Sequence, residues 1–301
     1  MDSLAAAPGT GPATSPLPVI RKPRPAATFE GLPKDRTLVM GILNVTPDSF
    51  SDGGQYKDTD SAIAAGLRMF YSGADIIDVG GESTRPGAEE VTPEEEQRRI
   101  LPVIRALVKA GALVSVDTTH TSTAAAAIEA GAAIINDVSG LTIEPDMPEL
   151  VARTKVPYIL THRRGDAKTM DSLTDYDNVA ADVVEELKGV RDKLYAAGVA
   201  PEQIIVDPGL GFAKNEAQNW ELMRNIHQLQ DLGHKVLVAA SRKRFLGTLL
   251  SVAGKAAAPE ERDAATAALT AISAAKGVWA VRVHDVGPSL DAVKVAARLR
   301  H

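Results

Sequence analysis

The chain alternates short apolar runs with longer segments that repeat apolar residues at helical spacing. Eight of the short runs are rich in Val, Ile and Leu, and polar residues do not alternate within them. Continuous apolar runs of this kind are typical of parallel strands that are buried on both faces. The predicted strands span residues 38–43, 75–79, 113–116, 132–135, 156–160, 203–206, 235–239 and 279–283.

Helical patterns fill the segments between these strands. The clearest one runs from residue 93 to 110, with Pro93 at a position that suits the first turn of a helix. Thr92 can cap this helix, and Glu95 can complete a capping box with it. Further helices are predicted at residues 60–72, 122–130, 178–197, 260–276 and 289–299.

This order of elements predicts the fold class. Eight strands separated by helices predict a (β/α)8 TIM barrel, as a single domain over residues 31–301. The alternative is an open doubly wound sheet, which would normally carry a glycine-rich loop after its first strand. Residues 44–50 read Asn-Val-Thr-Pro-Asp-Ser-Phe and do not fit such a loop. Residues 1–30 are rich in Pro, Ala and Gly, and we expect them to form a disordered tail.

The composition of the chain limits the functions that it can have. The net charge of −6 argues against nucleic acid or an anionic membrane surface as the main partner. The chain has no cysteine, which excludes disulfides, thiolate zinc sites and cysteine nucleophiles and agrees with a cytoplasmic location. No apolar run approaches the roughly 18 residues of a membrane span. We therefore expect small-molecule chemistry in a globular protein, with no nucleic-acid or membrane partner.

Polar residues stand at the end of every predicted strand. In a barrel the functional residues gather at the carboxyl ends of the strands, so these side chains are predicted to converge. Burying a charged side chain costs free energy unless it is paired or binds a ligand. So many polar tip residues are therefore not expected to converge by chance. The tip residues are Asn44, Glu82, Asp117, Asn136, Asp137, His162, Asp207, Ser241, Lys243, Arg282 and His284.

One group of tip residues suits an anion. Arg282 and His284 can donate to anionic oxygens, and Asn44 can offer its amide oxygen to Mg²⁺. These residues come from the first and last strands, which are neighbours in a closed barrel. Together they suit a diphosphate. The alternative is a structural ion pair of Arg282 with Asp78 or Asp285.

A second group suits a flat heterocycle. Asp117, Asn136 and Asp207 could accept N–H groups along the edge of an amino-pyrimidinone. Lys243 could donate to the carbonyl oxygen of the ring, and Arg282 could stack on its face. The polar loops after the first two strands could fold over a second substrate. His162 either lines the pocket or satisfies a neighbouring backbone group, and the second interpretation is favoured.

Seven segments together resemble dihydropteroate synthases, most closely those of actinobacteria. They follow the order of that family and cover all of the chain except the tail. The segments are residues 41–54, 78–87, 115–118, 135–138, 207–214, 241–243 and 282–286.

The resemblance implies an enzyme that condenses a dihydropterin methyl diphosphate with 4-aminobenzoate. Asn44 takes the position of the Mg²⁺ ligand in that family. The residues at positions that contact the pterin diphosphate are Thr84, Asp117, Asn136, Asp207, Lys243, Arg282 and His284, of which Asp117, Lys243, Arg282 and His284 are the predicted catalytic residues. The residues at the 4-aminobenzoate side and in the loops, where sulfonamides compete, are Phe50, Thr84, Arg85, Pro86 and Phe212. The resemblance also implies a homodimer that forms through the late helices.

The sequence departs from the family pattern in three places. Residues 161–165 read Thr-His-Arg-Arg-Gly, which predicts a more cationic pocket wall, and no role is carried over to His162. Residues 210–213 read Leu-Gly-Phe-Ala, which keeps the usual shape. Arg244 stands where a small residue is common, so its contact with 4-aminobenzoate stays open.

Two other functions are compatible with a pterin-binding barrel. A binding protein without turnover would be expected to have lost parts of the second loop or the Arg282-Val-His284 segment, and this chain keeps both. A methyltetrahydrofolate-dependent corrinoid methyltransferase would not need an anion clamp at Arg282 and His284. Formation of dihydropteroate, or dependence on a corrinoid, would discriminate between these functions.

Overall fold

Eight parallel strands close into a barrel in the order of the sequence. The computed structural model describes residues 29, 31–46, 55–83 and 90–300. The strands are β1 (Leu38–Asn44), β2 (Ile76–Gly80), β3 (Val114–Asp117), β4 (Ile134–Asp137), β5 (Tyr158–Thr161), β6 (Ile204–Asp207), β7 (Lys235–Val238) and β8 (Ala280–Val283). The barrel closes where β1 pairs with β8, with Leu38 opposite Ala280. The predicted (β/α)8 TIM barrel is confirmed, and most of the predicted tail lies outside the described residues.

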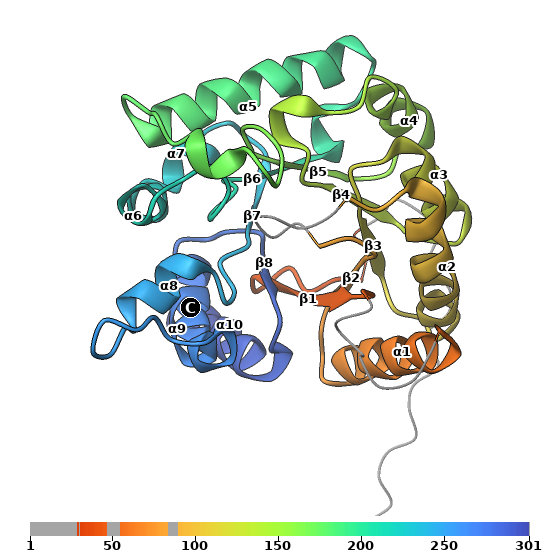
Figure 1. Ribbon diagram of the computed structural model, residues 1–301, viewed down its shortest axis with the longest axis horizontal. Helices are drawn as coiled ribbons and strands as arrows, with labels where there is room; N and C mark the ends of the chain where they lie inside the picture. The colour runs from red at the N-terminus through yellow and green to blue at the C-terminus, as the bar shows by residue number, and fades with distance from the viewer. Residues whose placement is uncertain (1–28, 30, 47–54, 84–89, 301) are drawn as a thin grey trace, which may run out of the picture.

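Helices form a ring around the strands (Figure 1). They are α1 (Gln55–Tyr71), α2 (Pro93–Lys109), α3 (Thr121–Glu129), α4 (Met147–Thr154), α5 (Val179–Ala196), α6 (Glu216–Arg224), α7 (His227–Gln230), α8 (Arg244–Leu249), α9 (Asp263–Ala275) and α10 (Val286–Arg300). The sequence patterns predicted six of these helices and missed α4, α6, α7 and α8. Within the described ranges, no helix combines the length and the apolar character that crossing a membrane requires.

One of the two predicted capping interactions is present at the start of α2. The Glu95 backbone N–H donates to Thr92 Oγ1 over 3.3 Å, so Thr92 caps the helix as expected. The Glu95 carboxylate instead accepts from Arg98 and Arg99, at 2.7 and 2.8 Å. The predicted capping box is therefore only half formed, because two arginines one turn further along compete for the same carboxylate.

The barrel interior has an apolar floor and a polar rim. The floor is a cluster with residues from seven of the strands and Leu113, which directly precedes β3; it includes Met40, Ile76, Ile134, Ile205 and Ala280. Successive side chains of a strand point to opposite faces, so the residue two positions later faces the interior again. Strand by strand, that rule brings polar side chains to the mouth of the barrel above the floor, at Asn44, Asp78, Asp117, Asn136, Asp207 and Arg282.

Candidate active site

Arg282 joins two acidic side chains at the rim. Its Nε donates to Asp78 Oδ2 over 2.6 Å, and its Nη2 donates to Asp117 Oδ2 over 2.5 Å. The Asn136 amide donates to the same oxygen of Asp78 over 2.9 Å. Four side chains from β2, β3, β4 and β8 thus form one hydrogen-bonded group, although up to 204 residues separate them along the chain.

This group retains free acceptors. Oδ1 of Asp78 and Oδ1 of Asp117 are buried without a hydrogen-bond partner among the described residues. An unpaired buried carboxylate oxygen is costly, so these atoms are suited to accept N–H groups of a ligand. Burial raises the pKa of Asp117 to about 7 even though Arg282 favours its ionised form. Asp78 was expected only as a structural partner of Arg282, and the structure places it within the site.

Asp207 and Lys243 form the opposite side of the rim. Asp207 Oδ1 accepts from the backbone N–H of Gly209 over 2.7 Å. Burial raises the pKa of Asp207, while the charge of Lys243 opposes that shift. Lys243 Nζ donates to the Leu210 carbonyl and lies 4.4 Å from the centre of the Phe212 ring. Burial lowers the pKa of Lys243 to about 8, while the charge of Asp207 favours the ammonium form.

His284 and Asn44 complete the predicted anion side. The His284 backbone N–H donates to Ser241 Oγ over 3.1 Å, and His284 Nδ1 lies 3.0 Å from the same oxygen. Asn44 is the half-buried last residue of β1, beside Gly80 at the end of β2. Arg282 has fewer donors available for an anion than the sequence predicted, because its Nε and Nη2 already donate to acidic side chains. Thr84, Arg85, Pro86 and Phe50 lie outside the described residues.

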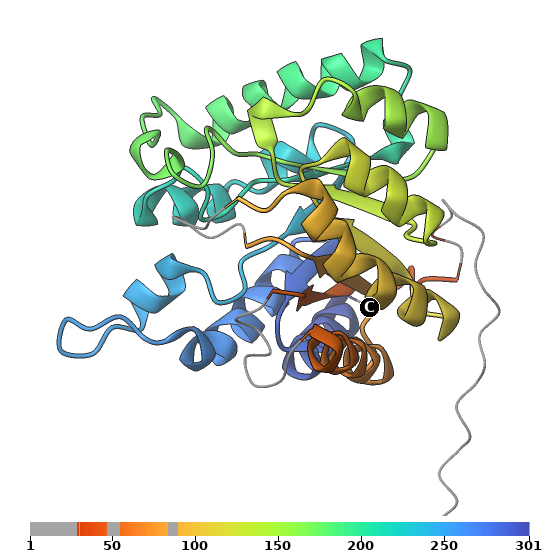
Figure 2. The ribbon, with the colours of Figure 1, turned by 45° about the vertical axis from the view of Figure 1, so that its right-hand side comes forward.

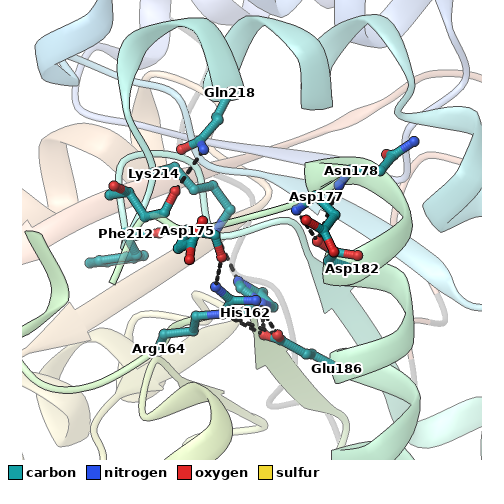
Figure 3. Close-up of polar contacts among 11 residues, drawn as sticks. His162, Arg164, Asp175, Asp177, Asn178, Asp182, Glu186, Phe212, Lys214 and Gln218 are labelled. Carbon is teal, nitrogen blue, oxygen red and sulfur yellow. Dashed lines mark hydrogen bonds and ion pairs between the residues drawn. The ribbon is translucent and has the colours of Figure 1, made fainter. Parts of the chain in front are cut away.

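His162 lies behind the rim, between Lys214 and Glu186 (Figure 3). We call these three hydrogen-bonded side chains the relay. His162 Nδ1 lies 2.8 Å from Lys214 Nζ, and its Nε2 lies 2.8 Å from Glu186 Oε2. Burial and the charge of Lys214 lower the pKa of His162 to about 4, so the ring is neutral at pH 7. Nδ1 then accepts from Lys214 while Nε2–H donates to Glu186. The favoured expectation that His162 satisfies a backbone group is wrong in its partner, because both ring nitrogens are paired with side chains.

Lys214 extends the relay to the loop after β6. Besides His162, its Nζ donates to the Gly209 carbonyl over 3.1 Å and to the Phe212 carbonyl over 2.9 Å. This loop carries the backbone N–H that binds Asp207 and the carbonyl that binds Lys243. Sequence reasoning did not select Lys214, although a lysine just after an Asp-Pro-Gly turn could have pointed to it.

Three arginines stand where the sequence departs from the family pattern, and two of them are bound by other protein groups. Arg164 donates to Glu186 and to the Asp175 carbonyl, and its guanidinium stacks 3.8 Å over the Tyr176 ring. Arg244 is exposed and pairs with Asp171 over 2.7 Å. Arg163 is buried, and its Nε has no hydrogen-bond partner among the described residues. Of the two predicted cationic additions at residues 163 and 164, Arg163 therefore has a donor without a partner in the described part of the chain.

Comparison with known proteins assigns this barrel to a class. The model of the pterin binding enzyme family matches residues 40–284. Dihydropteroate synthase of Mycobacterium leprae is 47% identical over 265 residues, which are 87% of this chain and 93% of that protein.

Solved structures agree with this comparison. Yersinia pestis dihydropteroate synthase, solved with a sulfonamide drug complex, superposes with a TM-score of 0.83 at 39% identity, covering 91% of this chain and 98% of that one. The Xanthomonas albilineans enzyme, solved in complex with 7,8-dihydropteroate, superposes with a TM-score of 0.78 at 38% sequence identity. The match covers 88% of this chain and 94% of that one.

The fold and the rim thus define a pterin-binding TIM-barrel enzyme. Within that class the chain belongs to the dihydropteroate synthase family.

Proposed function

We propose that this chain condenses (7,8-dihydropterin-6-yl)methyl diphosphate with 4-aminobenzoate, giving 7,8-dihydropteroate and diphosphate for tetrahydrofolate biosynthesis. The observation that supports this most is the rim itself. Three carboxylates surround one arginine and one lysine above an apolar floor, and two carboxylate oxygens are left without partners. A flat ring with N–H donors along one edge can donate to carboxylates arranged in this way.

In this proposal the rim holds the pterin by its edge. Asp117 and Asp207 accept ring N–H groups, and the Asn136 amide keeps Asp78 oriented. Lys243 donates to the ring carbonyl, because its Nζ already points to a carbonyl oxygen at the rim. Arg282 lies against the ring face while it balances the charges of Asp78 and Asp117.

The reaction breaks the bond between the pterin methylene and the diphosphate oxygen. The electron pair leaves with diphosphate, and positive charge develops on the methylene and the electron-rich ring. The amine nitrogen of 4-aminobenzoate then bonds to the carbon and releases a proton to solvent. Catalysis is electrostatic: Asp117 stabilises the developing cation, while Arg282 and His284 stabilise the departing anion.

Asn44 is the proposed protein ligand of Mg²⁺. A single neutral amide oxygen at the rim fits this cation, which usually keeps several waters and binds substrate phosphates through few protein ligands. When bound, Mg²⁺ neutralises charge on the diphosphate. The protein contributes the position of Asn44, which is fixed by the pairing of β1 with β2.

The remaining parts of the proposal concern the second substrate and the assembly. Phe212 lies beside Lys243 and would border 4-aminobenzoate together with residues 50 and 84–86. Competition by sulfonamides is proposed because the Yersinia pestis relative was solved with such a drug complex. A homodimer and a cytoplasmic location are proposed from the same family membership.

The deciding experiment measures 7,8-dihydropteroate formed from the two substrates with Mg²⁺. Turnover should fall at least about 100-fold in Lys243→Ala, because a donor that stabilises charge in a water-excluded site is worth roughly 3 kcal/mol. Lys255→Ala, at an exposed residue outside the site, is the control. Pterin diphosphate binding without product formation would favour a binding protein, and product formation that requires a corrinoid would favour a methyltransferase.

A further inference from the structure

Three side chains that the proposed reaction does not use meet beside the rim. Glu82 follows β2, Glu96 lies in the first turn of α2, and His120 precedes α3. Each offers one ligand atom, and the three atoms lie within 4.8 Å of one another. Gly81 allows this approach, since a Cβ there would lie 3.0 Å from Glu96 Cγ.

Glu96 is the centre of this cluster. It is fully buried, and its Oε2 accepts from Thr118 Oγ1 over 2.9 Å and lies 3.1 Å from His120 Nδ1. Its other oxygen, Oε1, is buried without a hydrogen-bond partner in the part of the chain that the structure describes. A fully buried carboxylate with a free oxygen requires a proton, a cation or a donor to offset its desolvation.

The arginine on the same helix does not supply that charge. Arg99 lies on the same helix, but its Nη1 donates to the Gly81 carbonyl and its Nε to Glu95. Burial and the neighbouring Glu96 raise the pKa of Glu82, as expected for two carboxylates that share a site. The cluster therefore holds up to two negative charges. The His120 imidazole contacts Glu96 directly, and the charge of Glu82 also acts on the buried Arg163.

We propose that Glu82, Glu96 and His120 bind one divalent cation of the first transition series, such as Mn²⁺ or Zn²⁺. Two carboxylate oxygens with one imidazole nitrogen are a ligand set for these ions, whereas Mg²⁺ favours oxygen alone. With metal–ligand bonds of about 2.1 Å, the ligand atoms of a tetrahedral site lie about 3.4 Å apart, so the widest pair of these atoms closes by up to about 1.4 Å on binding. Water completes the coordination.

The cation would join three consecutive units of the barrel. It would fix the segment after β2 to the first turn of α2 and to the residue that precedes α3. His120 lies three residues after Asp117, so the same clamp holds the start of the β3–α3 segment next to the rim. The site is separate from Asn44, which lies on β1 and needs the substrate diphosphate to complete its coordination.

The test is a titration of the chelator-treated protein with Mn²⁺ followed by electron paramagnetic resonance, without substrate. We expect one ion bound per chain at micromolar concentration. Glu96→Gln preserves the size of the side chain and should weaken binding at least tenfold. Glu95→Gln is the matched control on the adjacent residue, whose carboxylate binds Arg98 and Arg99 and not the cluster.

Two further variants separate the alternatives. His120→Asn, at a partly exposed position, should weaken Mn²⁺ binding even if Glu96→Gln fails to fold. Asn44→Ala should leave this binding unchanged, because it alters only the proposed Mg²⁺ ligand. The proposal is overturned if the stripped protein binds no stoichiometric Mn²⁺ or Zn²⁺, or if binding persists unchanged in His120→Asn and in folded Glu96→Gln. These outcomes do not depend on whether the chain forms dihydropteroate.

Discussion

Arg282 lies between two carboxylates that would otherwise repel each other inside the barrel. Asp78 is fully buried, Asp117 is 6% exposed, and both accept from the same guanidinium. The attraction offsets the desolvation of all three groups only while the geometry holds. Arg282 therefore has two effects: it stabilises the fold, and it keeps Asp117 in place for a ligand.

Replacing Arg282 should reveal its effect on stability. Arg282→Met leaves two buried carboxylates without their cation, and we expect the free energy of unfolding at pH 7 to fall by about 3–5 kcal/mol. Urea unfolding measures this. In the double variant Asp78→Asn/Arg282→Met one of the orphaned charges is gone, so part of the loss should return. Strictly additive effects of the two substitutions would show that the pair is not coupled.

The loop after β6 is positioned from behind by α5. Glu186 on α5 accepts from His162 over 2.8 Å, His162 contacts Lys214, and Lys214 binds two carbonyls of the loop. Gly209 shows how closely this loop approaches β5, because a Cβ there would lie 1.7 Å from the His162 carbonyl oxygen. Its φ of +66° also suits glycine. A helix on the outside of the barrel thus determines where Asp207 and Lys243 find their backbone partners.

The pH dependence of stability should reveal this relay. Burial alone would raise the pKa of Glu186, but hydrogen bonds from His162 and Arg164 outweigh it and lower the pKa from 4.5 to about 2. A carboxyl with a lowered folded-state pKa stabilises the fold above its unfolded pKa, and this contribution is lost as pH falls through the folded value. Glu186→Gln should therefore be less stable than the unaltered chain at pH 7, and the difference should shrink below about pH 4.5.

Urea unfolding at pH 7, 5, 4 and 3.5 checks this expectation. Glu185→Gln is the matched control, because the adjacent carboxylate is 77% exposed and pairs only with Lys188. It should change stability little at any of these pH values. A gap between Glu186→Gln and the unaltered chain that stays constant from pH 7 to 3.5 would contradict the relay.

The strands could be predicted from sequence because their physical signal is local. All eight lie within two residues of their predicted bounds, and most end one or two residues later than predicted, on a tip residue such as Asn44, Asp117 or Asp207. A polar tip residue still takes part in the ladder of backbone hydrogen bonds, so the end of an apolar run marks the last buried residue and not the last paired one.

The missed helices and contacts depend on information that is not local. α8 has only six residues, too few for a periodic pattern. α6 carried a readable signal in the reciprocal capping box of Asn215 and Gln218. The convergence of the tip residues follows from barrel closure and was predicted. The pairing of Arg282 with Asp78 was foreseen only as an alternative, because side-chain partners across the barrel depend on its register.

Exposed apolar side chains gather on the last part of the molecule. In the described part of the chain, the large hydrophobic residues that stand exposed between β7 and the C-terminus are Leu249, Leu250, Val252, Ile272, Val295 and Leu299. They come from α8 and the segment after it, α9 and α10, which lie together in Figure 1. Figure 2 shows α8 and the loop that follows it reaching away from the body. We expect α8, α9 and α10 to offer a surface suited to protein contact.

The proposed homodimer would bury this surface. Ile272 is 52% exposed on α9 and Leu299 is 83% exposed on α10. An aspartate introduced at Ile272 would place a charge in an apolar interface, so Ile272→Asp should shift the chain from dimer to monomer in sedimentation-velocity experiments. Tyr71→Asp is the control, because Tyr71 is also exposed but ends α1, which is not one of the late helices. If both variants sediment as dimers, the late helices are not the interface. If the unaltered chain is a monomer at micromolar concentration, the dimer itself is excluded. The proposed site is unaffected by that outcome, because its described residues all come from one chain.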